Sequence, residues 1–131
     1  MISNSWARAL LWISIAAAVG AMTLPLSAFT SHPYWERIVW IPFSDPRGGL
    51  LDDVENVVLF APLGFFLAGQ WRNRPFVIGR VLICGAALSA CGEFYQVFCP
   101  IRYPSVTDVM NNSLGAFLGA LAGNLIWKPI G

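Results

Sequence analysis

The sequence predicts an all-α protein, a four-helix transmembrane bundle that consists of two helical hairpins. Charged residues make up only 11% of its 131 residues, whereas an ordinary soluble domain carries about a quarter. The apolar residues are also concentrated in four blocks, and a block of about 20 apolar residues is long enough to cross a bilayer. Both observations indicate a single integral membrane domain that covers residues 1–131.

The first predicted span covers about residues 8–29 and has no charge from Ala9 to Phe29. An alternative interpretation is a signal peptide, because Arg8 precedes an apolar run that ends in small residues. The run is long for such a peptide, and the tripeptide LSA that it contains is a poor cleavage site. We therefore expect a span that is retained.

The other three spans are predicted at about residues 54–71, 75–98 and 106–127. What remains is one outer segment of modest length, Thr30–Leu51, and two short connections. A soluble bundle of buried helices is the competing interpretation. It is disfavoured because no stretch has the charged stripe that a helix on a protein surface needs.

Basic residues indicate how the chain is oriented in the membrane. Five of the eight basic residues lie where the predicted spans begin or end on one side of the membrane: Arg8, Arg72, Arg74, Arg80 and Lys128. All seven acidic residues lie on the other side or at its boundary. The positive-inside rule then predicts a multi-pass membrane protein with both termini in the cytoplasm.

Predicted spans two and four resemble each other in sequence. DVENVVLFAPLGFFLA, which begins at Asp53, aligns without gaps on DVMNNSLGAFLGALAG, which begins at Asp108. The alignment pairs Asp53 with Asp108 and Asn56 with Asn111. This internal repeat gives the two spans equivalent polar entrances, and membrane proteins often place binding sites where repeats meet. Gly115, Gly119 and Gly123 recur every four residues, a spacing that allows close helix packing.

A polar stretch, Cys91–Asn112, separates predicted spans three and four. Glu93 lies near the C-terminal end of its helix, where the helix dipole disfavours negative charge. Three interpretations of Glu93 remain open: an ion pair with Arg102, an ionisable group in a functional site, or a carboxylate that reaches toward water. Asp108 lies in the first turn of the next helix and could belong to its cap, with Ser105 or Thr107.

These polar side chains should lie at one depth, at the outer ends of three spans, and form an outward-facing site. The expected ligand-binding residues are Asp52, Asn56, Glu93, Gln96, Arg102, Asp108 and Asn112. A metal site based on histidine is not expected, because His32 is the single histidine and has no cluster around it. No cofactor is expected either.

The same residues, taken in order, resemble the VanZ-like family of small polytopic bacterial membrane proteins. The resemblance covers roughly Ile41–Gly123 and rests on five motifs in order: D-x-x-x-N at Asp52–Asn56, F-x-P-x-G at Phe60–Gly64, E-x-x-Q at Glu93–Gln96, Arg102 in a proline-containing loop, and D-x-x-x-N-x-x-G at Asp108–Gly115. The family spacing favours Asp52 and Asn112 as the inward-facing residues, whereas the repeat favours Asp53 and Asn111.

The resemblance implies a location in the bacterial inner (cytoplasmic) membrane. It also implies a function in the bacterial envelope, because the founding member contributes to resistance against teicoplanin, a lipid-tailed glycopeptide. We expect the chain to bind, or alter access to, an envelope lipid or a lipid-tailed glycopeptide. The alternative is a membrane-embedded enzyme that acts on a lipid head group with Glu93 and Asp108 as acid and base. The sequence shows no pairing of nucleophile and base, so an enzyme is the less favoured interpretation. A membrane lipid or lipid-linked envelope precursor is the expected partner, with a homo- or hetero-oligomer as an option and no nucleic acid.

Overall fold

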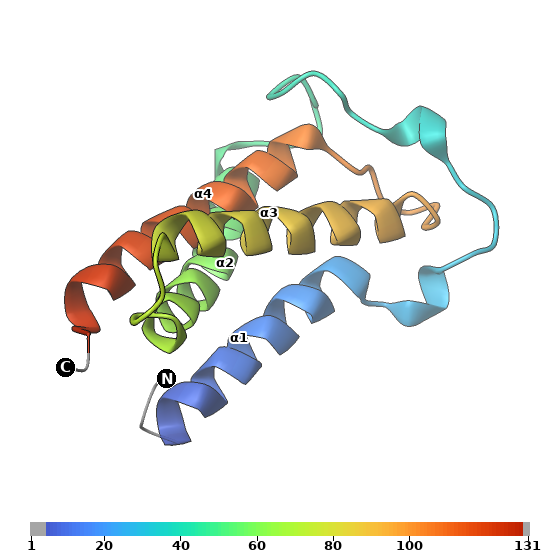
Figure 1. The fold of residues 1–131 in the computed structure, drawn as a ribbon. Helices are drawn as coiled ribbons and strands as arrows, with labels where there is room; N and C mark the ends of the chain where they lie inside the picture. Colours follow the sequence, from blue (N-terminus) through green and yellow to red (C-terminus); the bar gives the residue numbers. More distant parts are fainter. Residues whose placement is uncertain (1–4, 130–131) are drawn as a thin grey trace.

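The computed structural model describes residues 5–129, and within them the fold is all-α with no β-strand. Its four helices are α1 (Ser5–Thr23), α2 (Leu50–Gln70), α3 (Val77–Gln96) and α4 (Val106–Ile126) (Figure 1). Two short 3-10 turns, η1 (Leu26–Ala28) and η2 (Trp35–Arg37), lie in the long connection between α1 and α2. A single parallel bridge joins Val39 in that connection to Ser105. The predicted all-α class and its four helices are therefore confirmed.

Two helix boundaries differ from the predicted spans. α1 ends at Thr23 rather than near residue 29, because a residue that precedes proline is disfavoured in the helical conformation and Pro25 follows Leu24. α2 begins at Leu50 rather than near residue 54. The acidic residues Asp52 and Asp53 thus lie in its first turn, where their negative charge interacts favourably with the helix dipole.

Among residues 5–129, two segments are long and apolar enough to cross a membrane, Ser5–Ala28 and Val77–Gln96. The sequence predicted four such spans. α2 and α4 match the other helices in length, but each begins with charged and amide side chains that make its outer turns hydrophilic. The crossing of a membrane by α2 and α4 therefore stays a prediction.

α2 and α4 run parallel and in close backbone contact. A Cβ atom added at Gly115, Gly119 or Gly123 would meet the backbone carbonyl oxygens of Val57, Ala61 and Phe65, respectively. Both series advance by four residues, so the three glycines form a glycine face of α4 that lies against one face of α2. The predicted role of the glycine series in helix packing is confirmed.

The contacts between α2 and α4 also follow the internal repeat. Gly64 lies against the backbone of Ala116, and Gly119 lies against the backbone of Ala61. In the repeat alignment Gly64 corresponds to Gly119 and Ala61 to Ala116. The same contact is thus made twice with the partners exchanged, as in a two-fold symmetric interface.

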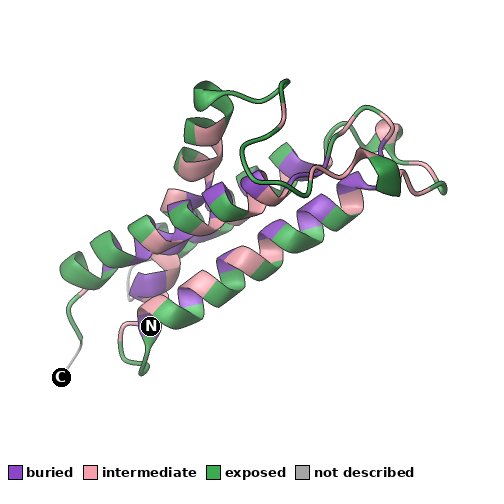
Figure 2. Ribbon diagram, turned by 90° about the horizontal axis from the view of Figure 1, so that it is seen from above, coloured by how far each residue is buried: buried purple, intermediate pink, exposed green. Residues whose placement is uncertain are grey.

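α1 and α3 pack around this pair. α3 contacts α4 closely, since a Cβ on Gly85 would lie 2.6 Å from that of Ala116. α1 packs against α3 where Met22 fills the space beside Gly92. Figure 2 shows the buried residues on the faces that helices turn toward one another and the exposed residues on their outer faces. The core is small and apolar, and it consists of Ala18, Met22, Phe60, Leu63, Ala68, Val77, Val81, Ala116 and Ala120.

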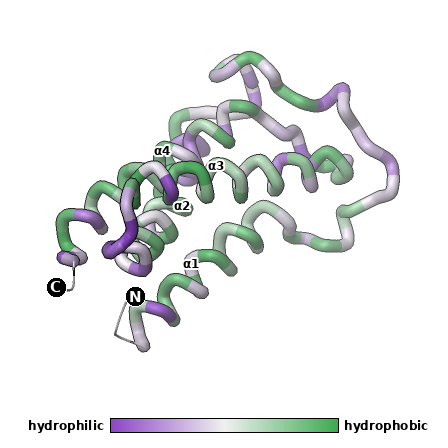
Figure 3. Tube along the Cα trace, viewed as in Figure 1, coloured by the Kyte–Doolittle hydropathy of each residue, from purple (hydrophilic) through white to green (hydrophobic). Residues whose placement is uncertain are grey.

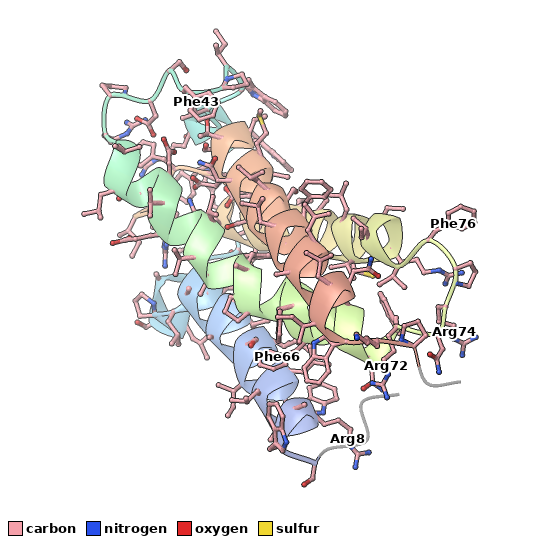
Figure 4. All side chains as sticks on the ribbon, turned by 90° about the vertical axis from the view of Figure 1, so that its left-hand side faces the viewer. Arg8, Phe43, Phe66, Arg72, Arg74 and Phe76 are labelled. Atoms are coloured by element: carbon pink, nitrogen blue, oxygen red, sulfur yellow. The ribbon has the colours of Figure 1, made fainter. Side chains whose placement is uncertain are left out.

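The two ends of the bundle differ in charge. Figure 3 shows hydrophilic stretches in the turn between α2 and α3 and in the long connection after α1, with hydrophobic stretches along the helices between them. Arg8, Arg72 and Arg74 lie together at one end, and Phe43 lies at the other (Figure 4). The described acidic residues belong to the end that carries Phe43, since they occupy the long connection, the beginnings of α2 and α4 and the end of α3.

Candidate functional site

Two amide–carboxylate pairs join the N-terminal parts of α2 and α4. Asn56 Nδ2 donates to Asp108 Oδ1 at 2.9 Å, and Asn111 Nδ2 donates to Asp53 Oδ1 at 2.7 Å. Each pair uses the asparagine of one repeat and the aspartate of the other, so the polar contacts obey the same two-fold exchange as the glycine contacts. The structure therefore favours Asp53 and Asn111, the residues that the repeat alignment pairs, as the ones that join the two helices.

Asn112 has a different role, deeper in the bundle. Its side chain is 1% exposed, and its Nδ2 donates to Ser89 Oγ of α3 at 2.8 Å. Asn112 Oδ1 has no hydrogen-bond partner among the described residues. Asn111 and Asn112 are thus both buried, and they join α4 to two different helices.

Glu93 forms part of the cap of α4, although it belongs to α3. Ser105 is the N-cap residue of α4, and its Oγ accepts a hydrogen bond from Asp108 N at 3.2 Å. In a complete capping box the residue at the position of Asp108 would accept from the Ser105 backbone N–H. Here Glu93 Oε2 accepts that bond at 2.7 Å. The carboxylate is disfavoured at the end of its own helix but lies at the positive end of α4, which explains its burial.

Arg102 and Gln96 bind the C-terminal carbonyl groups of α1. Arg102 donates to Ala21 O at 3.2 Å and to Leu24 O at 2.6 Å, and Gln96 Nε2 donates to Met22 O at 3.1 Å. The last carbonyl groups of a helix have no partner within the helix, and a cation beside them also interacts favourably with the helix dipole. Within residues 5–129, Glu93 and Arg102 form no direct ion pair.

The carboxylates at the start of α2 and α4 line an open cleft of about 420 Å³. Five acidic residues contribute to its wall: Asp45, Asp52, Asp53, Glu55 and Asp108. Asn56, Thr107, Phe43 and Tyr103 also line the cleft. We call this the acidic cleft.

Arg47 is the basic residue that lines the acidic cleft, and its position is fixed by two neighbours. Its Nε lies 2.9 Å from Asp45 Oδ1, and its guanidinium carbon lies 3.5 Å from the centroid of the Tyr103 ring. This stacking is close enough for a cation–π interaction. Because Asp45 neutralises Arg47, the net charge of the lining is strongly negative, and the cleft suits a hydroxyl-rich or amine-bearing group.

A second pocket of about 310 Å³ lies between α3, the start of α4 and the connection that carries η2. Its wall is mainly apolar and includes Trp35, Trp40 and Phe94, with Glu93 as the charged residue. Ser105 lines both this pocket and the acidic cleft. The two cavities are therefore neighbours that share Ser105 in their walls.

The predicted site residues fall into two groups. Asp52, Asn56 and Asp108 line the acidic cleft, and their role in binding a ligand stays a prediction. Glu93 instead lines the apolar pocket, while Gln96 and Arg102 bind α1 and Asn112 binds α3. The expectation that all seven share one cavity is wrong. Glu93, Gln96 and Arg102 instead bind backbone groups at helix ends. Asn112 bonds the Ser89 side chain inside the bundle.

Several lining residues were not among the predicted site residues, notably Asp45, Arg47, Glu55 and Tyr103. The acidic residues Asp45 and Glu55 were visible in the sequence as outer charges. Nothing in the sequence indicates that the long connection folds back so that Arg47 stacks on Tyr103 in the cleft wall. Within the described chain no group of three or more histidine, cysteine or acidic side chains is arranged to hold a metal ion.

Comparison with known proteins gives a family match over nearly the whole chain. The family model described as VanZ/LLP1 matches residues 6–127. Protein VanZ of Enterococcus faecium is 29% identical over 94 residues, which are 72% of this chain and 55% of that protein. The chain thus spans about half the length of this curated relative. No solved structure shows a significant match.

Proposed function

The chain belongs to the VanZ/LLP1 family, and from this premise we propose that it is a small integral membrane protein of the bacterial envelope. In this proposal the acidic cleft binds, or alters access to, an envelope lipid or a lipid-tailed glycopeptide. The ligand-binding residues are those that line the cleft, with Asp52, Asn56 and Asp108 among them.

The position of the acidic cleft carries the proposal. It opens at the end of the bundle opposite Arg8, Arg72 and Arg74. If all four helices cross the inner membrane, the positive-inside rule puts that basic end and both termini in the cytoplasm. The cleft then opens at the outer face, where lipid-linked cell-wall precursors and glycopeptides meet the membrane.

The chemistry of the two cavities supports an amphiphilic ligand. Carboxylates accept hydrogen bonds from hydroxyl groups and bind ammonium groups, so the cleft suits a sugar-bearing or amine-bearing head group. The neighbouring pocket, with Trp35, Trp40 and Phe94 in its wall, offers an apolar surface to a hydrocarbon chain. The shared residue Ser105 brings the two surfaces close enough for one molecule to contact both.

The alternative is a membrane-embedded enzyme that uses Glu93 and Asp108 as acid and base. It has less support, because Glu93 lines the apolar pocket and Asp108 lines the acidic cleft. Both side chains are also engaged in hydrogen bonds that join helices. A single reacting group would have to reach carboxylates that line two different cavities.

Binding measurements on the purified full-length chain test the proposal. Native mass spectrometry should find a retained lipid, and titration in detergent should detect teicoplanin or phosphatidylethanolamine. The double variant Asp52→Asn with Glu55→Gln removes two exposed cleft charges and should weaken binding at least about tenfold, since each is expected to contribute a charge-assisted hydrogen bond. Glu36→Gln, an exposed acid outside the cleft lining, serves as the control.

Three results would overturn the proposal. The first is the absence of retained lipid together with no binding of either probe. The second is binding that the double variant leaves unchanged. The third is equal weakening by Glu36→Gln, which would indicate a general effect of negative charge rather than a site.

A further inference from the structure

We propose that the end of the bundle opposite the acidic cleft is a second binding surface, one that holds the phosphate of an anionic phospholipid head group. We call it the basic end, and it consists of Arg8, Arg72, Arg74, Arg80 and Lys128. This proposal does not depend on the acidic cleft or on its ligand.

The four helix ends that carry these residues meet in space. The rings of Trp6 in α1 and Trp127 after α4 are 6.1 Å apart. A Cβ on Gly69, near the end of α2, would lie 2.7 Å from the Trp127 indole. Arg72 and Arg74 follow α2 directly, and Figure 4 shows both at the same end of the bundle as Arg8. Residues from distant parts of the sequence thus form one surface.

The positive charge of this surface is not neutralised within the described chain. The ion pair that the described residues form, Arg47 with Asp45, lies at the opposite end. Arg72 uses Nη1 to bind Gly69 O at 3.1 Å, and Arg80 uses Nε to bind Pro75 O at 2.9 Å. Those bonds orient the two guanidinium groups and leave further N–H donors for an anion. Forked N–H pairs of arginine match the oxygen atoms of a phosphate.

Phe76 makes a lipid a better fit than a free phosphate. It lies in the same turn, is 86% exposed and has a φ of 55°. A bulky side chain in the left-handed region is strained, and an exposed phenylalanine forgoes the gain from burial in an apolar environment. Between Arg74 and Arg80, this ring can enter the acyl region of a bilayer while the guanidinium groups remain at the head groups. The surface therefore matches a molecule with a phosphate next to hydrocarbon.

Native mass spectrometry of the full-length protein from mixed micelles tests this inference. The micelles hold equal amounts of phosphatidylglycerol and phosphatidylcholine, which differ in net charge. Wild-type protein should retain phosphatidylglycerol at least about tenfold more than phosphatidylcholine, as expected for several arginines near one anionic head group. The triple variant Arg72→Gln, Arg74→Gln, Arg80→Gln should lose that preference.

Matched variants distinguish loss of positive charge from loss of folding, and binding of a lipid from binding of a free phosphate. Replacing the same three arginines with lysine should keep most of the preference, and Arg37→Gln at the other end should keep all of it. Phe76→Ser should reduce phosphatidylglycerol retention several-fold while unfolding stays unchanged. Equal retention of both lipids by wild type, or retention unchanged in the triple glutamine variant, would overturn the proposal.

Inorganic phosphate, added as a competitor, distinguishes the two sources of the anion. Failure to displace the lipid at millimolar concentration supports a lipid site. Displacement together with no effect of Phe76→Ser shows a phosphate site instead and overturns the lipid assignment. Because the acidic cleft retains its residues in all of these variants, failure here leaves the proposed function standing.

Discussion

Replacing Glu93 with alanine should destabilise the fold even when no ligand is bound. The Glu93 side chain is 8% exposed and accepts the hydrogen bond of the buried Ser105 N–H. A buried donor left without a partner costs about 1–3 kcal/mol, and loss of a carboxylate at a helix N-terminus costs about 0.3–1 kcal/mol more. We therefore expect the free energy of unfolding to fall by about 2–3 kcal/mol in Glu93→Ala. Glu93→Gln keeps an acceptor oxygen, so it should lose only about 1 kcal/mol.

The assay is equilibrium unfolding in mixed micelles, with rising amounts of a denaturing detergent and helix content as the signal. Glu36→Ala removes an exposed acid from η2 and serves as the control, with an expected change within about 0.5 kcal/mol. If Glu93→Ala is as stable as Glu36→Ala, the cap is not important for folding. If the Glu93→Ala variant is stable but no longer binds teicoplanin or phosphatidylethanolamine, Glu93 is a ligand-binding residue.

Three further predictions concern the helix contacts. Gly119→Ala should lower the free energy of unfolding by about 1–3 kcal/mol, because the new Cβ clashes with the backbone of α2. The control Gly79→Ala, with nothing within 4 Å of the new Cβ, should raise it by up to about 1 kcal/mol. Equal effects of the two substitutions would contradict the close contact between α2 and α4. In a double-mutant cycle with Asn56→Ala and Asp108→Ala, the coupling energy should be about 0.6 kcal/mol, and strictly additive losses would show that the pair does not form. Arg102→Gln should speed hydrogen exchange in the last turn of α1 roughly tenfold, since about one hydrogen bond's stabilisation is lost, and unchanged exchange there would refute this role.

The internal repeat shows which contacts at the site the sequence predicts. Aligning the two D-V-x-N openings paired Asp53 with Asp108 and Asn56 with Asn111. The structure joins these four residues in two crossed hydrogen bonds. The family spacing favoured Asp52 instead, and that residue is exposed in the cleft wall. Contacts that depend on the symmetry of two similar helices were therefore visible in the sequence.

The polar stretch between α3 and α4 shows which contacts the sequence does not predict. Its composition indicated that Glu93, Gln96 and Arg102 each need a partner, but several partners were possible for each. The choice depended on which helix ends come close together: the start of α4 beside Glu93, and the end of α1 beside Gln96 and Arg102. Sequence patterns describe one helix at a time, whereas unpaired N–H and C=O groups at helix ends select their partners in space.

The sequence by itself determined the all-α class, the four helices, the glycine face of α4 and the separation of basic from acidic residues. Each of these follows from local composition or from a period along one chain segment. Only the tertiary structure decided which polar side chains cap helices and which line the acidic cleft. Both groups look alike in the sequence, and they differ only in whether a neighbouring helix end lies within hydrogen-bond distance.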